Sequence, residues 1–293
     1  MLAIAGTVPD ESFPLIRGRM TLKGDDTLII NGTEVPVNRG TPALAGAVIR
    51  AGEVLGLDAP EGILVGDIGR GEGSRKLYRH LVETLCEAEF STLVFHYLQP
   101  DVDWHNRILF ALDAMNQRPR LIADAGFMYA AKMSGQAISY DLFTPDVGEL
   151  SFLADETAPH PFYTRGFILH QDNQVPDLIN RACNHGNSAR HLLIKGRCDY
   201  VVCSDKITDQ VDQPSAEAME AVGGTGDTLT GIVSALMETN RPIPDSARIA
   251  ARANRLAGSF ASPTPASQVA DIIHHIPMAL SRAMEEQEKT SNE

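Results

Sequence analysis

A ten-residue segment gathers the residue types that could act on phosphate: Val-Gly-Gly-Thr-Gly-Asp-Thr-Leu-Thr-Gly at residues 222–231. Apolar residues at helical spacing predict a helix over residues 228–237. A glycine-rich turn that enters a helix presents free backbone N–H groups at the positive end of the helix dipole, and such a turn binds anions. We therefore expect a phosphate-binding turn made of Gly223, Gly224, Thr225 and Gly226.

Asp227 closes this turn. A bound phosphate repels a carboxylate, so an acid at this place suits a general base that takes a proton from the group attacking the phosphate. The structural alternative is an N-cap aspartate behind a flexible turn, although a cap needs one glycine or none. The segment is not a Walker P-loop, because no lysine follows Gly226.

Strand-like and helix-like segments alternate along the chain, which predicts a mainly parallel sheet covered by helices on both faces. The predicted strands are residues 26–30, 62–65, 91–98, 120–123 and 137–142, and residues 191–194 and 200–203 form a hairpin-like edge. The predicted helices are residues 43–57, 75–88, 106–115, 147–154, 175–185 and 247–261. We expect one domain over residues 1–284 and a polar tail over residues 285–293.

Polar residues directly after the predicted strands are the next candidates, because ligands of such sheets gather beyond the carboxyl ends of the strands. These residues are Asn31, Asp67, Asp124 and Lys195. A lysine at a strand end can reach a phosphate oxygen, and the structural alternative is a solvated lysine in a turn.

A second glycine-rich turn, residues 66–73, could be interpreted as a dinucleotide-binding Rossmann turn. Its spacing does not fit, and the next strand ends in Gln99-Pro100 instead of the acid that would bind ribose. Four cations in and after this turn could hold a diphosphate or a 2′-phosphate, or could form a solvated helix face. They are Arg70, Arg75, Lys76 and Arg79.

Composition excludes some classes of protein. The 293 residues are 43% hydrophobic and carry a net charge of −13, which argues against binding to nucleic acid or to a membrane surface. Four scattered cysteines form no Cys-X-X-Cys pair and suggest reduced thiols in the cytoplasm. No apolar run has the length of a membrane span, and the amino terminus lacks the pattern of a signal peptide.

The glycine-rich segment resembles the Gly-X-Gly-Asp signature of the ribokinase-like superfamily. Its form "GGTGDTLTGI" is most similar to the ADP/ATP-dependent NAD(P)H-hydrate dehydratases. The similarity extends to residues 23–32, 38–47, 144–149 and 193–196, and to the helical segments after Asp227. The resemblance implies a three-layer α/β/α fold with Asp227 as the catalytic base.

The resemblance also implies roles for individual residues, each beside a structural alternative. Lys195 and Gly196 are expected to contact the nucleotide phosphates. Pro145 and Asp146 could instead simply start a helix with Glu149 as a capping carboxylate, and small residues near position 43 could serve tight packing. The residues expected beside the substrate are Asn38, Gly40, Thr41, Ala43, Asp124, Asp146 and Glu149.

The chain departs from the family pattern at three places. Phe-His-Tyr-Leu-Gln-Pro at residues 95–100 stands where the family has Gly-Pro-Gly-Leu-Gly, Asp146 replaces a histidine, and residues 158–173 resemble an insertion. The predicted function is a dehydration of hydrated NAD(P)H that uses ADP or ATP and Mg²⁺. The alternatives are a kinase for a sugar or pyrimidine alcohol and a non-catalytic nucleotide sensor. Metal ligands are not specified, and a homo-oligomer is compatible with the sequence.

Overall fold

The computed structural model describes residues 1–156 and 175–291. The predicted insertion at residues 158–173 lies outside the described residues. The described part of the chain contains one sheet of 11 strands in the order β11-β10-β9-β8-β7-β6-β1-β5-β2-β3-β4. The prediction of one domain stays a prediction.

The centre of the sheet is parallel and both flanks are antiparallel. Six strands run in parallel: β9 (His191–Ile194), β8 (Leu142–Phe143), β7 (Arg120–Ala123), β6 (Thr92–His96), β1 (Leu2–Val8) and β5 (Glu61–Gly66). The antiparallel strands are β2 (Ile16–Lys23), β3 (Thr27–Ile30) and β4 (Thr33–Pro36) on one flank, and β10 (Asp199–Cys203) and β11 (Lys206–Val211) on the other. The predicted parallel sheet is therefore confirmed for its centre. The antiparallel pair of β9 and β10 is confirmed as well, but the edge of the sheet is β11, which was not predicted.

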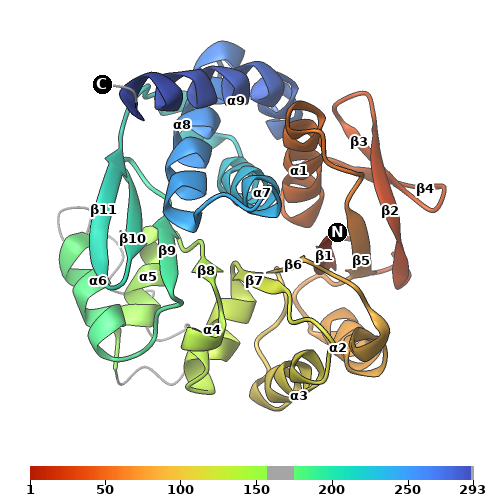
Figure 1. The fold of residues 1–293 in the computed structure, drawn as a ribbon. Coiled ribbons are helices and arrows are strands. Elements are labelled where there is room, and N and C mark those ends of the chain that lie inside the picture. Colours follow the sequence, from red (N-terminus) through yellow and green to blue (C-terminus); the bar gives the residue numbers. More distant parts are fainter. Residues whose placement is uncertain (157–174, 292–293) are drawn as a thin grey trace.

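Helices cover both faces of the sheet and make a three-layer α/β/α structure (Figure 1). One face carries α1 (Thr41–Leu55), α7 (Thr225–Glu238), α8 (Ile243–Ala261) and α9 (Val269–Ser291). The other face carries α2 (Glu72–Thr84), α3 (Val102–Asp113), α4 (Gly126–Met133), α5 (Val147–Ala154) and α6 (Val175–Asn184). Each layer of helices buries its own apolar core against the sheet, because strands of a buried sheet present apolar side chains to both faces.

Some predicted elements were wrong or missing. Residues 137–142 are not one strand, because a 3₁₀ turn at Ala137–Ser139 precedes the two-residue β8. The first strand, β1, was not predicted, although every one of its residues is buried at the middle of the sheet. The polar tail over residues 285–293 stays a prediction, although its described part is helical, because α9 continues to Ser291. An Arg282–Glu286 pair at i,i+4 spacing supports this helix.

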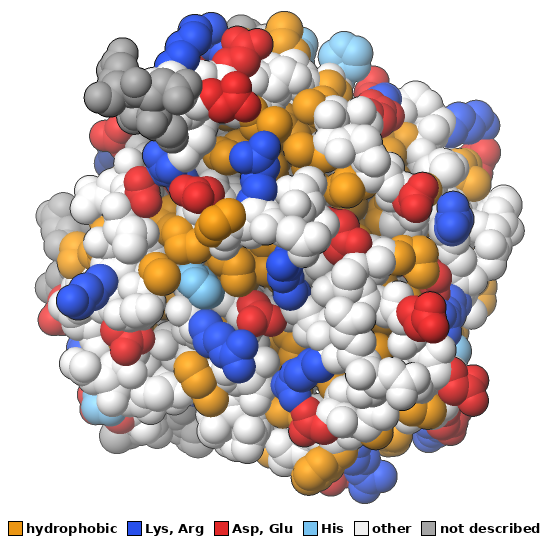
Figure 2. All heavy atoms as spheres, viewed as in Figure 1, with side chains coloured by type: hydrophobic (Ala, Val, Ile, Leu, Met, Phe, Trp, Pro, Cys, Tyr) orange, Lys and Arg blue, Asp and Glu red, His pale blue; other side chains and the backbone are white. Residues whose placement is uncertain are grey.

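The surface shown in Figure 2 mixes charges of both signs. Lys and Arg side chains lie among Asp and Glu side chains, and the described part of this face has no continuous basic patch. Among the described helices, none combines the length and the hydropathy that a membrane span requires.

Candidate active site

The glycine-rich segment forms the start of α7, and Asp227 lies in its first turn. The N-cap residue Gly224 has φ 102°, and a Cβ at this position would come within 3.1 Å of Val269 and 3.2 Å of the Arg39 backbone. Glycine is therefore required here for both conformation and space. The turn leaves the first N–H groups of α7 without partners in the helix, as the phosphate-binding prediction requires.

The Asp227 carboxylate is buried, and neighbouring groups lie close to each of its two oxygens. The backbone N–H of Gly40 donates to Oδ2 at 2.6 Å. Oδ1 lies 3.2 Å from Nε2 of His96, the last residue of β6. The loop before α1, predicted to lie beside the substrate, is thus brought directly to the predicted base.

Lys195 and Asp124 form the second polar centre of the site. The Lys195 ammonium donates to Oδ1 and Oδ2 of Asp124 at 3.0 and 2.9 Å, and Thr230 Oγ1 donates to Oδ2 at 2.6 Å. Burial opposes charge on Asp124, but Lys195, His96 and Thr230 outweigh it and lower the pKa of Asp124. Burial likewise opposes charge on Lys195, and Asp124 and Glu149 more than compensate and raise the pKa of Lys195. Both groups are therefore charged at neutral pH.

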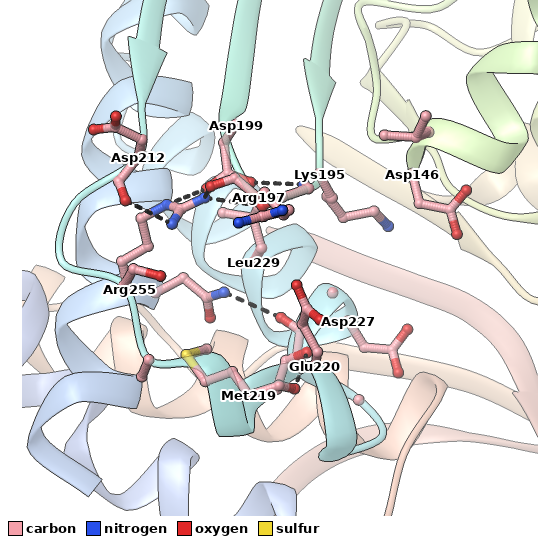
Figure 3. Close-up of a pocket in the computed structure, with 18 of the residues that line it drawn as sticks. Asp146, Lys195, Arg197, Asp199, Asp212, Met219, Glu220, Asp227, Leu229 and Arg255 are labelled. Carbon is pink, nitrogen blue, oxygen red and sulfur yellow. Dashed lines mark hydrogen bonds and ion pairs between the residues drawn. The ribbon is translucent and has the colours of Figure 1, made fainter. Parts of the chain in front are cut away.

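Arg255 of α8 fixes the loop that follows Lys195. Its Nε donates to Asp199 Oδ2 at 2.7 Å, and its Nη2 donates to the carbonyl oxygens of Gly196 and Arg197 at 2.9 and 3.0 Å. Asp199 in turn accepts the N–H of Gly196 at 3.0 Å. Figure 3 shows this network at one end of the pocket, with Lys195 and Asp227 toward the other. Arg255 was not predicted from the sequence, because no local pattern connects it to a loop more than fifty residues earlier.

Asp146 and Glu149 make a capping box at the start of α5, so the structural alternative for this pair is confirmed. Asp146 Oδ1 accepts the N–H of Glu149 at 2.7 Å, and Glu149 Oε2 accepts the N–H of Asp146 at 2.8 Å. Burial, followed by the charges of Asp146 and Asp124, raises the pKa of Glu149 well above its usual range. Both side chains also line the pocket, so capping does not remove them from the site.

A pocket of about 950 Å³ joins these groups at the carboxyl ends of the parallel strands. Of the predicted residues, it is lined by Asp124, Asp146, Glu149, Lys195, Gly196, Gly224, Thr225, Gly226 and Asp227. The structure does not bring all predicted residues to the wall of the pocket. Gly223 and Asn38 are exposed and do not line it, and Gly40 contacts the lining residue Asp227. Thr41 and Ala43 are fully buried, and Ala43 belongs to the core around α1. Tight packing therefore explains Ala43.

The other polar residues at strand ends organise loops. Asp67 Oδ1 accepts hydrogen bonds from the N–H groups of Gly69, Arg70 and Gly71 at 3.0 Å each. Its Oδ2 accepts a hydrogen bond from the N–H of Ser74. The N–H groups that a dinucleotide-binding turn would offer to a diphosphate are therefore occupied by Asp67. Asn31 lies in the β3–β4 turn and donates to the carbonyl of Arg17.

Comparisons with known proteins point to one family. The family model described as NAD(P)H-hydrate dehydratase matches residues 100–277. An uncharacterised protein of Methanocaldococcus jannaschii is 39% identical over 242 residues, which are 82% of this chain and 100% of that protein. The ADP-dependent (S)-NAD(P)H-hydrate dehydratase of Cenarchaeum symbiosum is 32% identical over 142 residues, 48% of this chain and 44% of that enzyme. The match thus spans less than half of the named dehydratase.

Solved structures show the fold. A phosphofructokinase-2 mutant from Escherichia coli has a TM-score of 0.58 at 19% identity, covering 96% of this chain and 100% of that one. A ribokinase-like superfamily protein from Enterococcus faecalis has a TM-score of 0.56 at 14% identity, covering 96% and 87%. The ribokinase-like architecture predicted from the sequence is confirmed. Because the matching family model covers more than half of its residues, the chain belongs to the NAD(P)H-hydrate dehydratase family of carbohydrate-kinase-like proteins.

Proposed function

We propose that this protein dehydrates hydrated NAD(P)H at the expense of ADP or ATP. The observation that carries the proposal is the position of Asp227, in the first turn of α7 and at the wall of a pocket of about 950 Å³. The buried Lys195 lies at the same pocket and supplies positive charge. Four free cysteines among the described residues support a cytoplasmic place for this metabolite repair.

In the first step, Asp227 takes the proton of the hydroxyl group on the hydrated nicotinamide ring as that oxygen attacks the terminal phosphate of the nucleotide. A phosphate ester forms, and the bond to the nucleotide's leaving oxygen breaks. The N–H groups of Gly224, Thr225 and Gly226 at the start of α7 stabilise the charge on the transferring group. Lys195 carries a positive charge toward the same phosphates.

In the second step, the ring nitrogen's lone pair expels the phosphate with the electrons of its C–O bond. Loss of a proton from the neighbouring ring carbon then restores the reduced nicotinamide. A kinase would share the first step and stop at the ester, so the Gly-X-Gly-Asp turn is common to both reactions.

The residues at the pocket also fit Mg²⁺, which prefers carboxylate oxygens together with phosphate oxygens and water. Burial and the neighbouring carboxylates Asp146 and Asp124 raise the pKa of Glu149, and a cation near this cluster would stabilise its charged form. Asp146 and Glu149 would hold the ion together with the nucleotide. When bound, Mg²⁺ neutralises phosphate charge.

The test is a turnover assay with purified protein, Mg²⁺, NADH hydrate and either ADP or ATP, followed by the return of absorbance at 340 nm. We expect recovery that needs nucleotide, and a loss of about 10²–10⁴-fold in rate for Asp227→Asn. Nucleotide binding without recovery would contradict the proposal and direct a screen of sugar and pyrimidine alcohols. Full turnover by Asp227→Asn would remove the general base from the mechanism.

A further inference from the structure

His96 is a buried polar residue that the proposed reaction does not yet use. It ends β6, between β1 and β7, and has no exposed surface. It belongs to the segment where the chain departs from the Gly-Pro-Gly-Leu-Gly turn of its family. A fully buried imidazole at the catalytic edge of the sheet requires partners for both ring nitrogens.

The surroundings of His96 determine which ring nitrogen carries the proton. Nδ1 lies 3.0 Å from the hydroxyl oxygen of Thr41, which can donate to it. Nε2 faces two carboxylates, 3.2 Å from Asp227 Oδ1 and 3.7 Å from Asp124 Oδ2. A lone pair on Nε2 would be repelled by both acids, so Nε2 carries a hydrogen. The Nε2 contact does not yet have hydrogen-bond geometry, and such contacts often align only when substrate binds.

The two carboxylates are not equally available to this hydrogen. Asp124 already accepts hydrogen bonds from the Lys195 ammonium, the Thr230 hydroxyl and the N–H of Ala125. Asp227 accepts only the N–H of Gly40 on Oδ2 among its described hydrogen bonds, and its Oδ1 is the oxygen nearer to Nε2.

The side chains of His96, Asp124 and Asp227 are close enough to one another to hold a metal ion. A metal there would have to share Asp124 with the Lys195 ammonium, 2.9 Å away, which disfavours a cation.

The packing around His96 makes room for its contact with Thr41. A Cβ on Gly6 of β1 would lie 2.6 Å from Thr41 Oγ1 and 2.8 Å from the backbone oxygen of His96. After His96 the backbone turns sharply, with Tyr97 at φ 53°. The Tyr97 ring meets the imidazole edge-on with centroids 4.6 Å apart. Conformation and packing therefore hold the ring in one orientation.

We propose that His96 is a positioning residue for Asp227, an inference that rests on the proposed role of Asp227 as general base. The Nε2–H of His96 and the N–H of Gly40 hold one carboxylate oxygen each. They fix the plane of the carboxylate and leave its remaining lone pairs to the substrate hydroxyl. Thr41 acts one step further away, because its hydroxyl keeps the imidazole in the required tautomer.

The kinetic test compares two variants, each of which replaces the imidazole with an amide group near the position of one ring nitrogen. His96→Gln places an amide near the position of Nε2, whereas His96→Asn reaches only the position of Nδ1. We expect His96→Gln to keep kcat within about fivefold, and His96→Asn to lose about 10–100-fold in kcat with an unchanged KM for nucleotide. Thermal unfolding controls for folding. Wild-type kcat in His96→Asn, or equal losses in both variants, would overturn the proposal.

A second readout does not depend on turnover. Long-range ¹H–¹⁵N spectra of protein labelled in its nine histidines report the tautomer of each ring, and His96→Gln assigns the signal of His96. We expect the Nε2–H tautomer, with a shift change in Asp227→Asn that is absent in Asp103→Asn, an acid at 70% side-chain exposure. An Nδ1–H tautomer, or no response to Asp227→Asn, would overturn the inference. The wild type could fail to restore NADH while the spectra still show the Nε2–H tautomer and its response to Asp227→Asn. In that case only the proposed substrate is wrong, and the inference about His96 stands.

Discussion

The buried pair of Lys195 and Asp124 allows a sharp test of how the site is held together. Lys195 is 13% exposed and Asp124 2% exposed, and the ammonium is the closest positive charge to this carboxylate. We consider Lys195→Met, which keeps the length of the side chain, together with Asp124→Asn and the double variant. Lys195→Met removes the positive charge of the pair, Asp124→Asn removes the negative charge, and the double variant removes both.

The expected magnitudes follow from burial. Removal of one partner of a buried pair leaves an uncompensated charge and costs about 3–5 kcal/mol of the free energy of unfolding. The double variant leaves neither charge of the pair without its partner, so its cost is smaller than the sum of the single costs. We expect a coupling energy of about 2–3 kcal/mol, at the upper end for residues in direct contact.

The pH dependence has a defined sign. The pKa of Asp124 is lowered in the folded protein, because Lys195, His96 and Thr230 outweigh the effect of burial. Its contribution to stability is therefore fully present above the ordinary value of 3.8 and is lost as pH falls through the lower folded pKa. Lys195→Met removes the charge that lowers the pKa of Asp124 most. We therefore expect this variant to lose less stability than the wild type when the pH is lowered.

The assay is urea unfolding of the four proteins without nucleotide, at pH 7 and at acidic pH, followed by circular dichroism. Nucleotide is left out because its binding would stabilise the folded state by mass action. A Lys195→Met variant within about 1 kcal/mol of wild type at pH 7, or an additive cycle, would refute the reasoning from burial.

Three further predictions concern the surroundings of the site. Gly6→Ala should lower the free energy of unfolding in urea by about 1–3 kcal/mol, since the new Cβ overlaps Thr41. A variant as stable as the wild type would show that α1 can shift to make room. Asp146→Ala should cost about 1 kcal/mol through the lost cap of α5, with Asp146→Ser as the matched control; equal stability of the two variants would contradict a capping role. Arg255→Lys should weaken ADP binding about tenfold by calorimetry, because lysine lacks the fork that holds the Gly196 loop, and unchanged binding would separate this loop from the nucleotide.

Several features of this protein follow from local sequence. The bounds of β7 and α5 agree with the prediction, and so does the capping box at Asp146. The helix predicted over residues 228–237 is α7, which begins three residues earlier at Thr225. It could be predicted because glycines, a threonine and an apolar period lie within one short segment. Such signals arise from backbone conformation and from hydrogen bonds between near neighbours, which depend on a few adjacent residues.

Only the tertiary structure decided what Asp227, Lys195 and His96 contact. The N–H that holds Asp227 comes from Gly40, 187 residues away, and Lys195 meets its acid across 71 residues. His96 entered the site only because β6 lies beside β1 and places its last residue against α1 and α7. Strand order is set by the burial of apolar faces over the whole sheet, so no local pattern reports it. The sequence by itself determined the reactive turn, and the fold decided which buried charges and donors surround it.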